Sequence, residues 1–599
     1  MSHSSCVWGL GFSPAAQAPL TQLNQSGLVH TLLLAGGDRA PAAVLAEAWP
    51  SADAFVIVGA CGLVTRLIAP LLGDKSTDPA VVVVDPEGRF AIPLLGGHRA
   101  GGEALSQAVA AVLGGTAVLT GSSSATGRLA LDQFGAAWGW RRGSGDWTAL
   151  MQSAARSGGR IAVTQTAGSQ RWRQLAGAAA IEESPTTDSA TQAGASQLVI
   201  GPELGAGCRW HPPCLWLGMG CERGTSASLL GRLVDASLAA AGLASEAVAG
   251  LASVDRKGDE AALLQLAEQR HWPLRLYGAA ELAAVPVPNP SAVVAAEMGT
   301  ASVAEAAALL AAGSGAALLL PKQVEHRQAG EQGAATLAIA RMEEQWAPQR
   351  GQLHLVGSGP GQLDLLTGDA RRALAATSVW VGYGPYLDLL EPLRRPDQLR
   401  CDGQLTEERQ RCALALELAS QGLCVALVSS GESGIYGMAG LALELWLAEP
   451  PQQRPGFAVH PGISAVQLAA ARIGAPLMHD FCTISLSDRL TPWPVIERRL
   501  QAAASGDFVV ALYNPRSRDR NWQLQRACQI LLVQRPPSTP VLLARQLGRS
   551  QETLALHSLG QLPFEQVDML TLVLVGNSTS RSQEGWMVTP RGYPGAELG

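Results

Sequence analysis

The sequence has little charge and almost no lysine. Charged residues make up 16% of its 599 residues, and the net charge is −6. A nucleic-acid-binding chain normally has a basic balance, so this composition argues against a general nucleic-acid binder. Lysine occurs only at Lys75, Lys257 and Lys322, so arginine supplies nearly all of the positive charge. Arginine holds planar carboxylates better than lysine does, although genomic base composition also favours arginine.

The sequence also lacks the features of exported and membrane-inserted proteins. Its ten cysteines are scattered and do not form the dense pattern of a disulfide scaffold. Residues 1–11 contain no basic segment followed by an apolar one, so no signal peptide is expected. The apolar run at 304–320 is interrupted by glycine and serine and falls short of the roughly 20 residues that span a membrane. A buried helix and strand are expected there, and we expect a cytoplasmic protein without a membrane partner.

The chain is rich in short β-branched runs, each followed by a glycine turn and an Ala/Leu-rich stretch. Buried strands are expected at 54–59 and 80–85, a helix at 103–113, and the same alternation over 214–277. Such alternation predicts a multi-domain α/β protein with largely parallel sheets. Polar, proline-containing joints divide the chain. We expect domains at 1–135, 206–340, 351–460 and 461–599, a divergent middle segment and linker at 136–205, and a linker at 341–350.

In the second half of the chain, five expected strands are each associated with a loop of small or polar residues. They read LHLVGSGPG from residue 353, VALVSSGESGIYG from 425, VHPGISA from 459, FVVALYNP from 508 and LTLVLVGNS from 570. Glycines let a backbone approach a ligand, and several such loops along one sheet edge are what a ligand site requires. The first turn is a poor dinucleotide fingerprint, because Gln362 stands where G-x-G-x-x-G needs its last glycine. This argues against a nicotinamide-dependent dehydrogenase.

The order of these motifs over 351–591 resembles the tetrapyrrole methylase family, and within it the precorrin-3B C(17)-methyltransferases. The stretches SLSDRLTPWPVIERRL and LYNPRSRDRNWQLQRA carry the same resemblance. It implies two α/β domains with S-adenosyl-L-methionine in the cleft between them. Together with the glycines of the first turn, the matching positions imply cofactor contacts at Gly357, Gly359, Pro360, Ser430, Gly431, Glu432, Ile435, Ser464, Ala465, Tyr513 and Asn514.

One loop departs from the family pattern. The family usually has Ser-Gly-Asp-Pro where this chain has Ser430, Gly431, Glu432 and Ser433. The acid is one methylene longer and the stiffening proline is missing. The geometry of this loop is therefore left open by the sequence.

The reaction implied by the resemblance is methylation at C-17 with contraction of the macrocycle and lactone formation. Alignment of donor and acceptor supplies most of the acceleration of a methyl transfer, but ring contraction makes a proton shuttle useful. His479 and Asp480 are candidates for that shuttle; the alternative is that they orient a loop. Arg516 and Arg518 are candidates for binding substrate carboxylates, and the alternative is a solvated charged face.

In the first half, the stretches LLGGHRAGGE from residue 94, LGMGCERGTSASLL from 217 and MGTASVAEAAALLAAG from 298 resemble the cobalt-precorrin-5A hydrolase family. That family opens the lactone made during ring contraction and releases acetaldehyde. Such hydrolysis needs an activated water and a group that moves protons. The candidates are His98 as the base, with Glu103 and Lys322 as further catalytic residues, and Arg99 and Arg223 as carboxylate binders.

A cluster of soft metal ligands has an unusual spacing. Cys208, His211, Cys214 and Cys221 read C-x2-H-x2-C-x6-C with two prolines, which is not a standard zinc pattern. We therefore expect no resident metal. The hydrolase family acts in the route that inserts cobalt early, so cobalt is expected only as part of the substrate.

Together, the resemblances predict a bifunctional enzyme of cobalamin (corrin ring) biosynthesis that acts on precorrin-3B or cobalt-factor III and on cobalt-precorrin-5A. A homodimer formed through the methylase half is expected. The alternative is a methyltransferase whose N-terminal half is a non-catalytic tetrapyrrole-binding or scaffold module. Methylases of RNA or protein side chains share the fold, but the negative charge and the TPWPVIERRL stretch argue against them.

Overall fold

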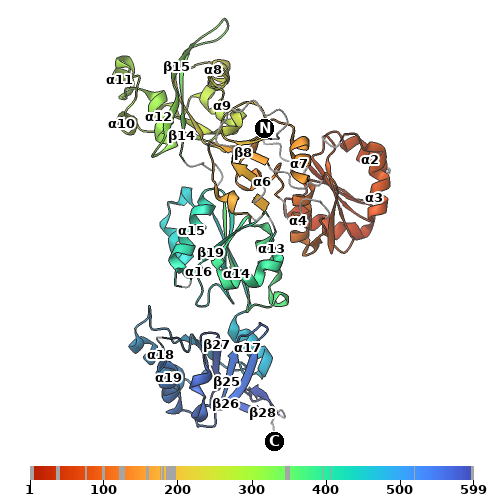
Figure 1. Ribbon diagram of the computed structural model, residues 1–599, viewed down its shortest axis with the longest axis vertical. Helices are drawn as coiled ribbons and strands as arrows, with labels where there is room; N and C mark the ends of the chain where they lie inside the picture. The colour runs from red at the N-terminus through yellow and green to blue at the C-terminus, as the bar shows by residue number, and fades with distance from the viewer. Residues whose placement is uncertain are drawn as a thin grey trace.

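The computed structural model describes most of the chain and places six β-sheets within the described ranges. Figure 1 shows them as successive bodies, with the C-terminal sheet at one end of the molecule. The described residues are 6–34, 41–74, 77–96, 101–119, 129–156, 161–175, 177–178, 181–183, 197–343, 351–395, 397–404, 406–518 and 520–594.

The first sheet has the order β2-β1-β3-β4-β5-β6 and is parallel except for the β4–β5 pair. Strands β3 and β4 are apolar along their whole length and fully buried, as expected where helices cover both faces of a parallel sheet. The expected strands and helix are confirmed here. The elements are β1 Val7–Gly11, α1 Gln17–Gln25, β2 Thr31–Leu34, α2 Pro41–Ala48, β3 Ala54–Val58, α3 Cys61–Ile68, β4 Ala80–Val84, β5 Phe90–Leu95, α4 Gly102–Leu113 and β6 Thr116–Ala117.

The stretch that the sequence left without an assignment forms a second sheet, ordered β7-β11-β10-β8-β9. Its core is built on aromatic rings: Phe134 lies 5.3 Å from Trp172 and 6.0 Å from Trp210 between ring centroids. Aromatic packing carries no short motif, which explains why sequence patterns did not reveal it. The elements are α6 Phe134–Ala137, β7 Arg141–Arg142, α7 Trp147–Ala155, β8 Ile161–Gln165, β9 Ile181–Glu183, β10 Gln197–Ile200 and β11 Cys208–His211.

The third sheet, β14-β13-β12-β16-β15, is only half parallel. Strands β12, β13 and β14 are parallel as expected, whereas β15 and β16 form an antiparallel hairpin. The short connection between β15 and β16 permits only antiparallel pairing. The elements are β12 Leu215–Cys221, α8 Ala227–Ala240, β13 Val248–Val254, α9 Ala261–Arg270, β14 Leu274–Tyr277, α10 Ala279–Ala283, α11 Ala292–Met298, α12 Val303–Ala312, β15 Ala317–His326 and β16 Ala334–Arg341.

Among the helices of the described ranges, none is by itself long and apolar enough to cross a membrane. Helices α11 and α12 reach the length and apolar composition of a membrane span only when taken together, and the pair bends by 74° at the break between them.

The fourth sheet, β19-β18-β20-β17-β21, is parallel throughout. Its strands are joined by helices, so every strand points its carboxyl end toward the same edge. The elements are β17 Gln352–Gly357, α13 Gly368–Ala376, β18 Val379–Tyr383, α14 Gly384–Leu390, β19 Leu399–Gly403, α15 Glu408–Ser420, β20 Cys424–Ser429, α16 Ala439–Ala448 and β21 Gly456–His460.

The fifth sheet, β23-β24-β27-β25-β26, is mostly antiparallel, which corrects the expectation of a parallel sheet here. Only β23 and β24 are parallel, because a helix connects them. The elements are α17 Ala465–Ile473, β23 Phe481–Ser485, α18 Trp493–Ser505, β24 Val509–Tyr513, α19 Gln523–Leu532, β25 Pro540–Arg545, β26 Thr553–Ser558 and β27 Thr571–Val575, with a small sixth sheet of β22 Gly474–Ala475, β28 Arg581–Gln583 and β29 Trp586–Val588.

The second sheet packs directly against the fourth. Buried residues of both sheets form one continuous hydrophobic core, and Arg171 pairs with Glu417 at 3.6 Å across the boundary. The unassigned stretch is therefore a folded module that attaches the N-terminal half to the parallel sheet (Figure 1).

Candidate active site

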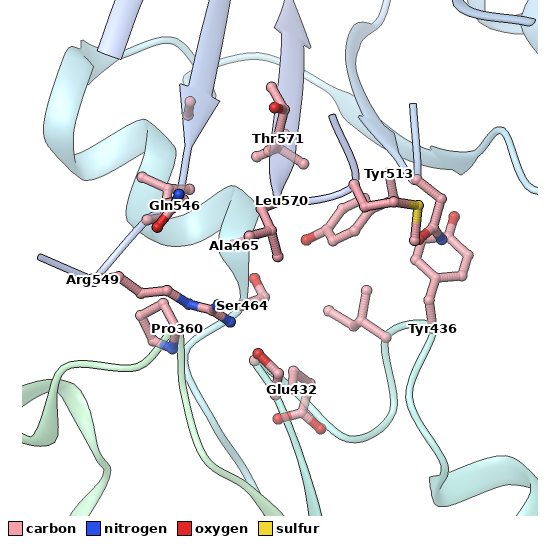
Figure 2. Close-up of a pocket in the computed structure, with 18 of the residues that line it drawn as sticks. Pro360, Glu432, Tyr436, Ser464, Ala465, Tyr513, Gln546, Arg549, Leu570 and Thr571 are labelled. Carbon is pink, nitrogen blue, oxygen red and sulfur yellow. The ribbon is translucent and has the colours of Figure 1, made fainter. Parts of the chain in front are cut away.

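A cavity lies between the parallel fourth sheet and the mixed fifth sheet (Figure 2). The loops that follow β17, β20 and β21 line one side of it, and strand ends of the fifth sheet line the other. The lining residues are Pro360, Tyr386, Ser430, Gly431, Glu432, Ile435, Tyr436, Ser464, Ala465, Tyr513, Asn514, Ala544, Gln546, Leu547, Arg549, Met569, Leu570, Thr571 and Leu572.

All but two of the positions matched to cofactor contacts line this cavity; the exceptions are Gly357 and Gly359. Gly359 has a φ of +69°, and its backbone exchanges two hydrogen bonds with Gly431. A Cβ at Gly462 would lie 2.0 Å from the carbonyl oxygen of Gly431 and 2.6 Å from that of Gly357. These glycines therefore let three loops touch one another and form one wall of the cavity.

The unusual acid Glu432 joins two of these loops. Its Oε1 accepts a hydrogen bond from the Gly434 N–H at 3.1 Å, and its Oε2 accepts one from the Gly462 N–H at 2.7 Å. The longer side chain thus links its own turn to the loop after β21. This link stiffens a turn that lacks the usual proline.

Two tyrosines form an aromatic wall that joins the two sheets. The rings of Tyr436 and Tyr513 lie 5.1 Å apart, and the Tyr436 hydroxyl donates to the Thr483 carbonyl oxygen at 2.9 Å. The Tyr513 hydroxyl accepts from the Val466 N–H at 3.2 Å at the start of α17. Burial raises the pKa of Tyr513, so the phenol stays neutral and serves as a hydrogen-bonding group.

A buried arginine, Arg520, supports the side of the cavity that the fifth sheet forms. Asn514 has a φ of +50°, and its carbonyl oxygen accepts from Nε of Arg520 at 2.8 Å. The other nitrogens of Arg520 reach Ser487 Oγ and Met569 Sδ, each at 3.3 Å. Burial lowers the pKa of this guanidinium. Arg520 therefore ties the loop after β24 to the turn before β27.

The fifth sheet contributes lining residues that sequence reasoning missed. The expected polar loop of the last motif lies at the wrong end of β27, because β27 runs antiparallel to β24. Residues at the start of β27 line the cavity instead, whereas Ser578 beyond its end hydrogen-bonds to Asp507. The missed residues are Ala544, Gln546, Leu547, Arg549, Met569, Leu570, Thr571 and Leu572.

The catalytic candidates of the methylase half lie elsewhere. His479 and Asp480 are exposed and precede β23, at the end of that strand away from Asn514, and neither lines the cavity. Arg516 pairs with Glu565 at 2.8 Å, and Arg518 is exposed. Neither arginine lines the cavity either, and the four assigned roles remain predictions.

A histidine pair that the sequence did not reveal lies on the neighbouring strands β17 and β21, next to the loop that follows β21. Nδ1 of His354 lies 2.9 Å from Nε2 of His460, and Nδ1 of His460 lies 2.8 Å from Oδ2 of Asp369. Burial and the neighbouring His460 both lower the pKa of His354. Thr367 Oγ1 donates to the Pro461 carbonyl oxygen at 2.8 Å. The start of α13 therefore holds the loop that leads to Ser464.

The candidates of the N-terminal half are dispersed over two sheets. His98 and Arg99 lie outside the described residues, and Glu103 lies in the first turn of α4. Arg223 pairs with Asp259. Lys322 donates through Nζ to the Asn289 carbonyl oxygen at 3.0 Å. The roles of these residues remain predictions.

Glu305 is buried beside Lys322. It accepts hydrogen bonds from Asn289 and from the Lys322 N–H. Burial alone would raise its pKa, but these hydrogen bonds outweigh burial and lower it. Glu305 therefore fastens α12 to β15.

The cysteine-rich stretch after β10 forms strands. Burial raises the pKa of Cys208 and Cys221 to about 11 and that of Cys214 to about 12, so these thiols are protonated at neutral pH. Nδ1 of His211 lies 2.7 Å from the Gly201 carbonyl oxygen. Within the described ranges, no three His, Cys, Asp or Glu side chains gather as metal ligands do.

Three family models match the chain in the order of its domains. The model for the cobalamin synthesis G N-terminal region matches residues 43–124, and that for the cobalamin synthesis G C-terminus matches 215–340. The model for tetrapyrrole (corrin/porphyrin) methylases matches 352–563, which includes the whole fourth sheet and every strand of the fifth sheet except β27.

Relatives of the C-terminal half are similar along nearly their whole length. A probable cobalt-factor III C(17)-methyltransferase of Salmonella typhimurium is 48% identical over 40% of this chain and 99% of its own. A precorrin-3B C(17)-methyltransferase of a Sinorhizobium species is 42% identical over 41% of this chain and 98% of its own. A solved methyltransferase, CobJ, is 38% identical over 40% of this chain and all of its own, with a TM-score of 0.38. The chain therefore belongs to the tetrapyrrole methylases and carries a cobalamin synthesis G region before its methylase domain.

Proposed function

We propose that this chain is a bifunctional enzyme of corrin-ring synthesis. Its C-terminal half methylates C-17 of precorrin-3B or cobalt-factor III with ring contraction, and its N-terminal half opens the lactone of cobalt-precorrin-5A and releases acetaldehyde. The observation that carries the methylase part is the cavity: residues from Pro360 to Asn514, matched to cofactor contacts from the sequence, come together on its walls.

The cavity fits S-adenosyl-L-methionine. Polar residues of the Ser430–Glu432 turn and Ser464 before α17 line it, whereas Ile435, Leu547 and Leu570 give an apolar surface. Such a mixture of apolar lining and a few fixed polar groups is typical of cofactor sites. The cofactor supplies a methyl group on a sulfonium. The protein then contributes alignment, because the glycine turns and Arg520 hold the walls in place.

The N-terminal half is proposed to be catalytic. Matches to the cobalamin synthesis G regions cover strands β3 to β6 of its first sheet and nearly all of its third sheet, and they support this over a purely structural role. The same route places cobalt in the substrate, so we propose cobalt-factor III as the preferred substrate of the methylase half. We also propose a homodimer formed through the methylase half.

One assay tests both activities in the full chain. Incubation with S-adenosyl-L-methionine and cobalt-factor III should yield a methylated, ring-contracted product by mass spectrometry. Failure to incorporate a methyl group into either cobalt-factor III or precorrin-3B would refute the methylase proposal. Equal or better turnover of metal-free precorrin-3B would refute the cobalt preference alone.

A second assay tests the N-terminal half. Cobalt-precorrin-5A is prepared by adding the intervening methyltransferase, and acetaldehyde is then measured. Acetaldehyde should appear with the wild-type chain and decrease in the Glu103→Gln variant if Glu103 moves protons. Methylation without any acetaldehyde would favour the non-catalytic scaffold.

A further inference from the structure

Arg549 is the only positively charged residue among the described residues that line the cavity. Figure 2 shows its guanidinium extending from the turn after β25, past Pro360, into the cavity. It lies 5.9 Å from the centre of the Tyr386 ring. The one acid that lines the cavity, Glu432, already accepts two backbone hydrogen bonds from Gly434 and Gly462.

Arg549 differs in this respect from the arginines around it. Arg545, four residues earlier, pairs with Asp568 at 2.6 Å, and Arg516 pairs with Glu565. Arg520 is buried among three hydrogen-bond partners. With the residues of the described ranges, the Arg549 side chain makes neither a hydrogen bond nor an ion pair, only the contact with the Tyr386 ring.

The turn that carries Arg549 is held in place. The Gly548 N–H donates to Glu552 Oε2 at 2.6 Å, and the Arg549 N–H donates to the Gln546 carbonyl oxygen at 3.1 Å. Glu552 also pairs with Arg472 at 3.1 Å, so the nearest acid along the chain is engaged elsewhere. The stem of Arg549 passes close to Gly361, where a Cβ would lie 3.2 Å from its Cγ. The side chain is thus directed into the cavity before any ligand arrives.

A half-buried guanidinium has lost part of its hydration, and without an anionic partner no electrostatic attraction compensates for that loss. Its planar set of donors matches a carboxylate in two-point geometry. We propose that Arg549 binds a carboxylate of the ligand that occupies this cavity. This inference rests on the proposed function, since both proposed ligands carry that group: the cofactor on its amino-acid end and the macrocycle on its acid side chains.

The test compares the Arg549→Gln and Arg549→Lys variants with the wild-type chain. The affinity for S-adenosylhomocysteine is measured by calorimetry, and KM for the tetrapyrrole is measured at saturating cofactor. Because a charge-assisted hydrogen bond is lost, either the Kd for S-adenosylhomocysteine or the KM for the tetrapyrrole should rise about tenfold or more in Arg549→Gln. The rise should be smaller in Arg549→Lys. Arg526→Gln is the control, because Arg526 is exposed on α19 and its side chain pairs, among the described residues, only with Glu497.

The two carboxylate sources give different results. A weaker affinity for S-adenosylhomocysteine with an unchanged affinity for 5′-methylthioadenosine, which has no carboxylate, would assign the contact to the cofactor. A raised KM for the tetrapyrrole alone would assign it to the macrocycle. Unchanged constants in an active Arg549→Gln variant, or an equal loss for both nucleosides without a change in KM, would overturn the proposal. A wild-type chain that transfers no methyl group would instead refute the proposed function.

Discussion

The two sheets that enclose the cavity contribute different chemistry to it. The parallel sheet supplies mainly backbone, through glycine turns after β17, β20 and β21 that touch one another at Gly357, Gly431 and Gly462. The mixed sheet supplies mainly side chains, such as Tyr513, and Arg520 supports them from behind. Where a wall is made of backbone, an added methyl group displaces the chain, whereas a side-chain wall loses one contact at a time.

The largest effect should follow from a change in the backbone wall. In Gly462→Ala, the new Cβ would overlap the carbonyl oxygens of Gly431 and Gly357, so the three turns must separate. We expect the affinity for S-adenosylhomocysteine, measured by calorimetry, to fall about 100-fold, equivalent to roughly 3 kcal/mol. Gly440→Ala is the control, because a Cβ there meets nothing within 4 Å. Equal affinities in both variants, with intact circular dichroism, would show that the turns adjust independently.

A smaller effect is expected when Arg520, which supports the side-chain wall of the cavity, is replaced. Arg520→Met removes the donors to the Asn514 carbonyl oxygen and Ser487 Oγ. We expect the free energy of unfolding of this domain to fall by about 2–3 kcal/mol, and the S-adenosylhomocysteine affinity to fall with it. Arg526→Met, which removes only an exposed pair, should cost about 0.5 kcal/mol or less. Equal denaturation midpoints for the two variants would show that Arg520 does not stabilise the cavity.

The Glu432 carboxylate, which links two of the glycine turns, should contribute less to cofactor affinity than the close backbone contact at Gly462. Glu432→Gln keeps one acceptor for the two N–H groups of Gly434 and Gly462. We expect the affinity for S-adenosylhomocysteine to weaken about threefold, the equivalent of roughly 0.7 kcal/mol. A loss as large as that in Gly462→Ala would mean that the carboxylate contacts the ligand itself.

The smallest effect concerns the histidine pair on the neighbouring strands β17 and β21 of the parallel sheet. Because the pKa of His354 is lowered, the folded state binds fewer protons than the unfolded state just below the ordinary histidine pKa. The stability of this region should therefore fall as the pH is lowered from neutrality toward the folded-state pKa of His354. Hydrogen exchange of β17 and β21 amides between pH 7.5 and about 5.5 measures it. His354→Gln should flatten this dependence, whereas a variant of the exposed His326 should not; an equal slope in both would exclude His354.

Sequence reasoning succeeded on one wall of the cavity for a physical reason. In a parallel sheet every carboxyl strand end reaches the same edge, so the loops after β20 and β21 were expected to line a ligand site. Ser430 and Ser464, which do line the cavity, were matched individually through the family resemblance. The same rule misplaced the last motif, because β27 is antiparallel and its start, at Thr571, lines the cavity. Arg549 was missed because it lies in a turn between antiparallel strands, without a motif of its own.

Local features of this protein can be read from its sequence alone: strand and helix periods, the glycine turns, and the motifs that identify the methylase half. These depend on residues close in the chain, whose chemistry limits the backbone directly. Tertiary contacts alone set which strand ends meet, that Glu432 reaches Gly462, and that Arg549 faces the cavity without an acidic partner among the described residues. Those features depend on contacts between distant segments, and neither the spacing nor the composition of a sequence encodes the direction in which two such segments approach.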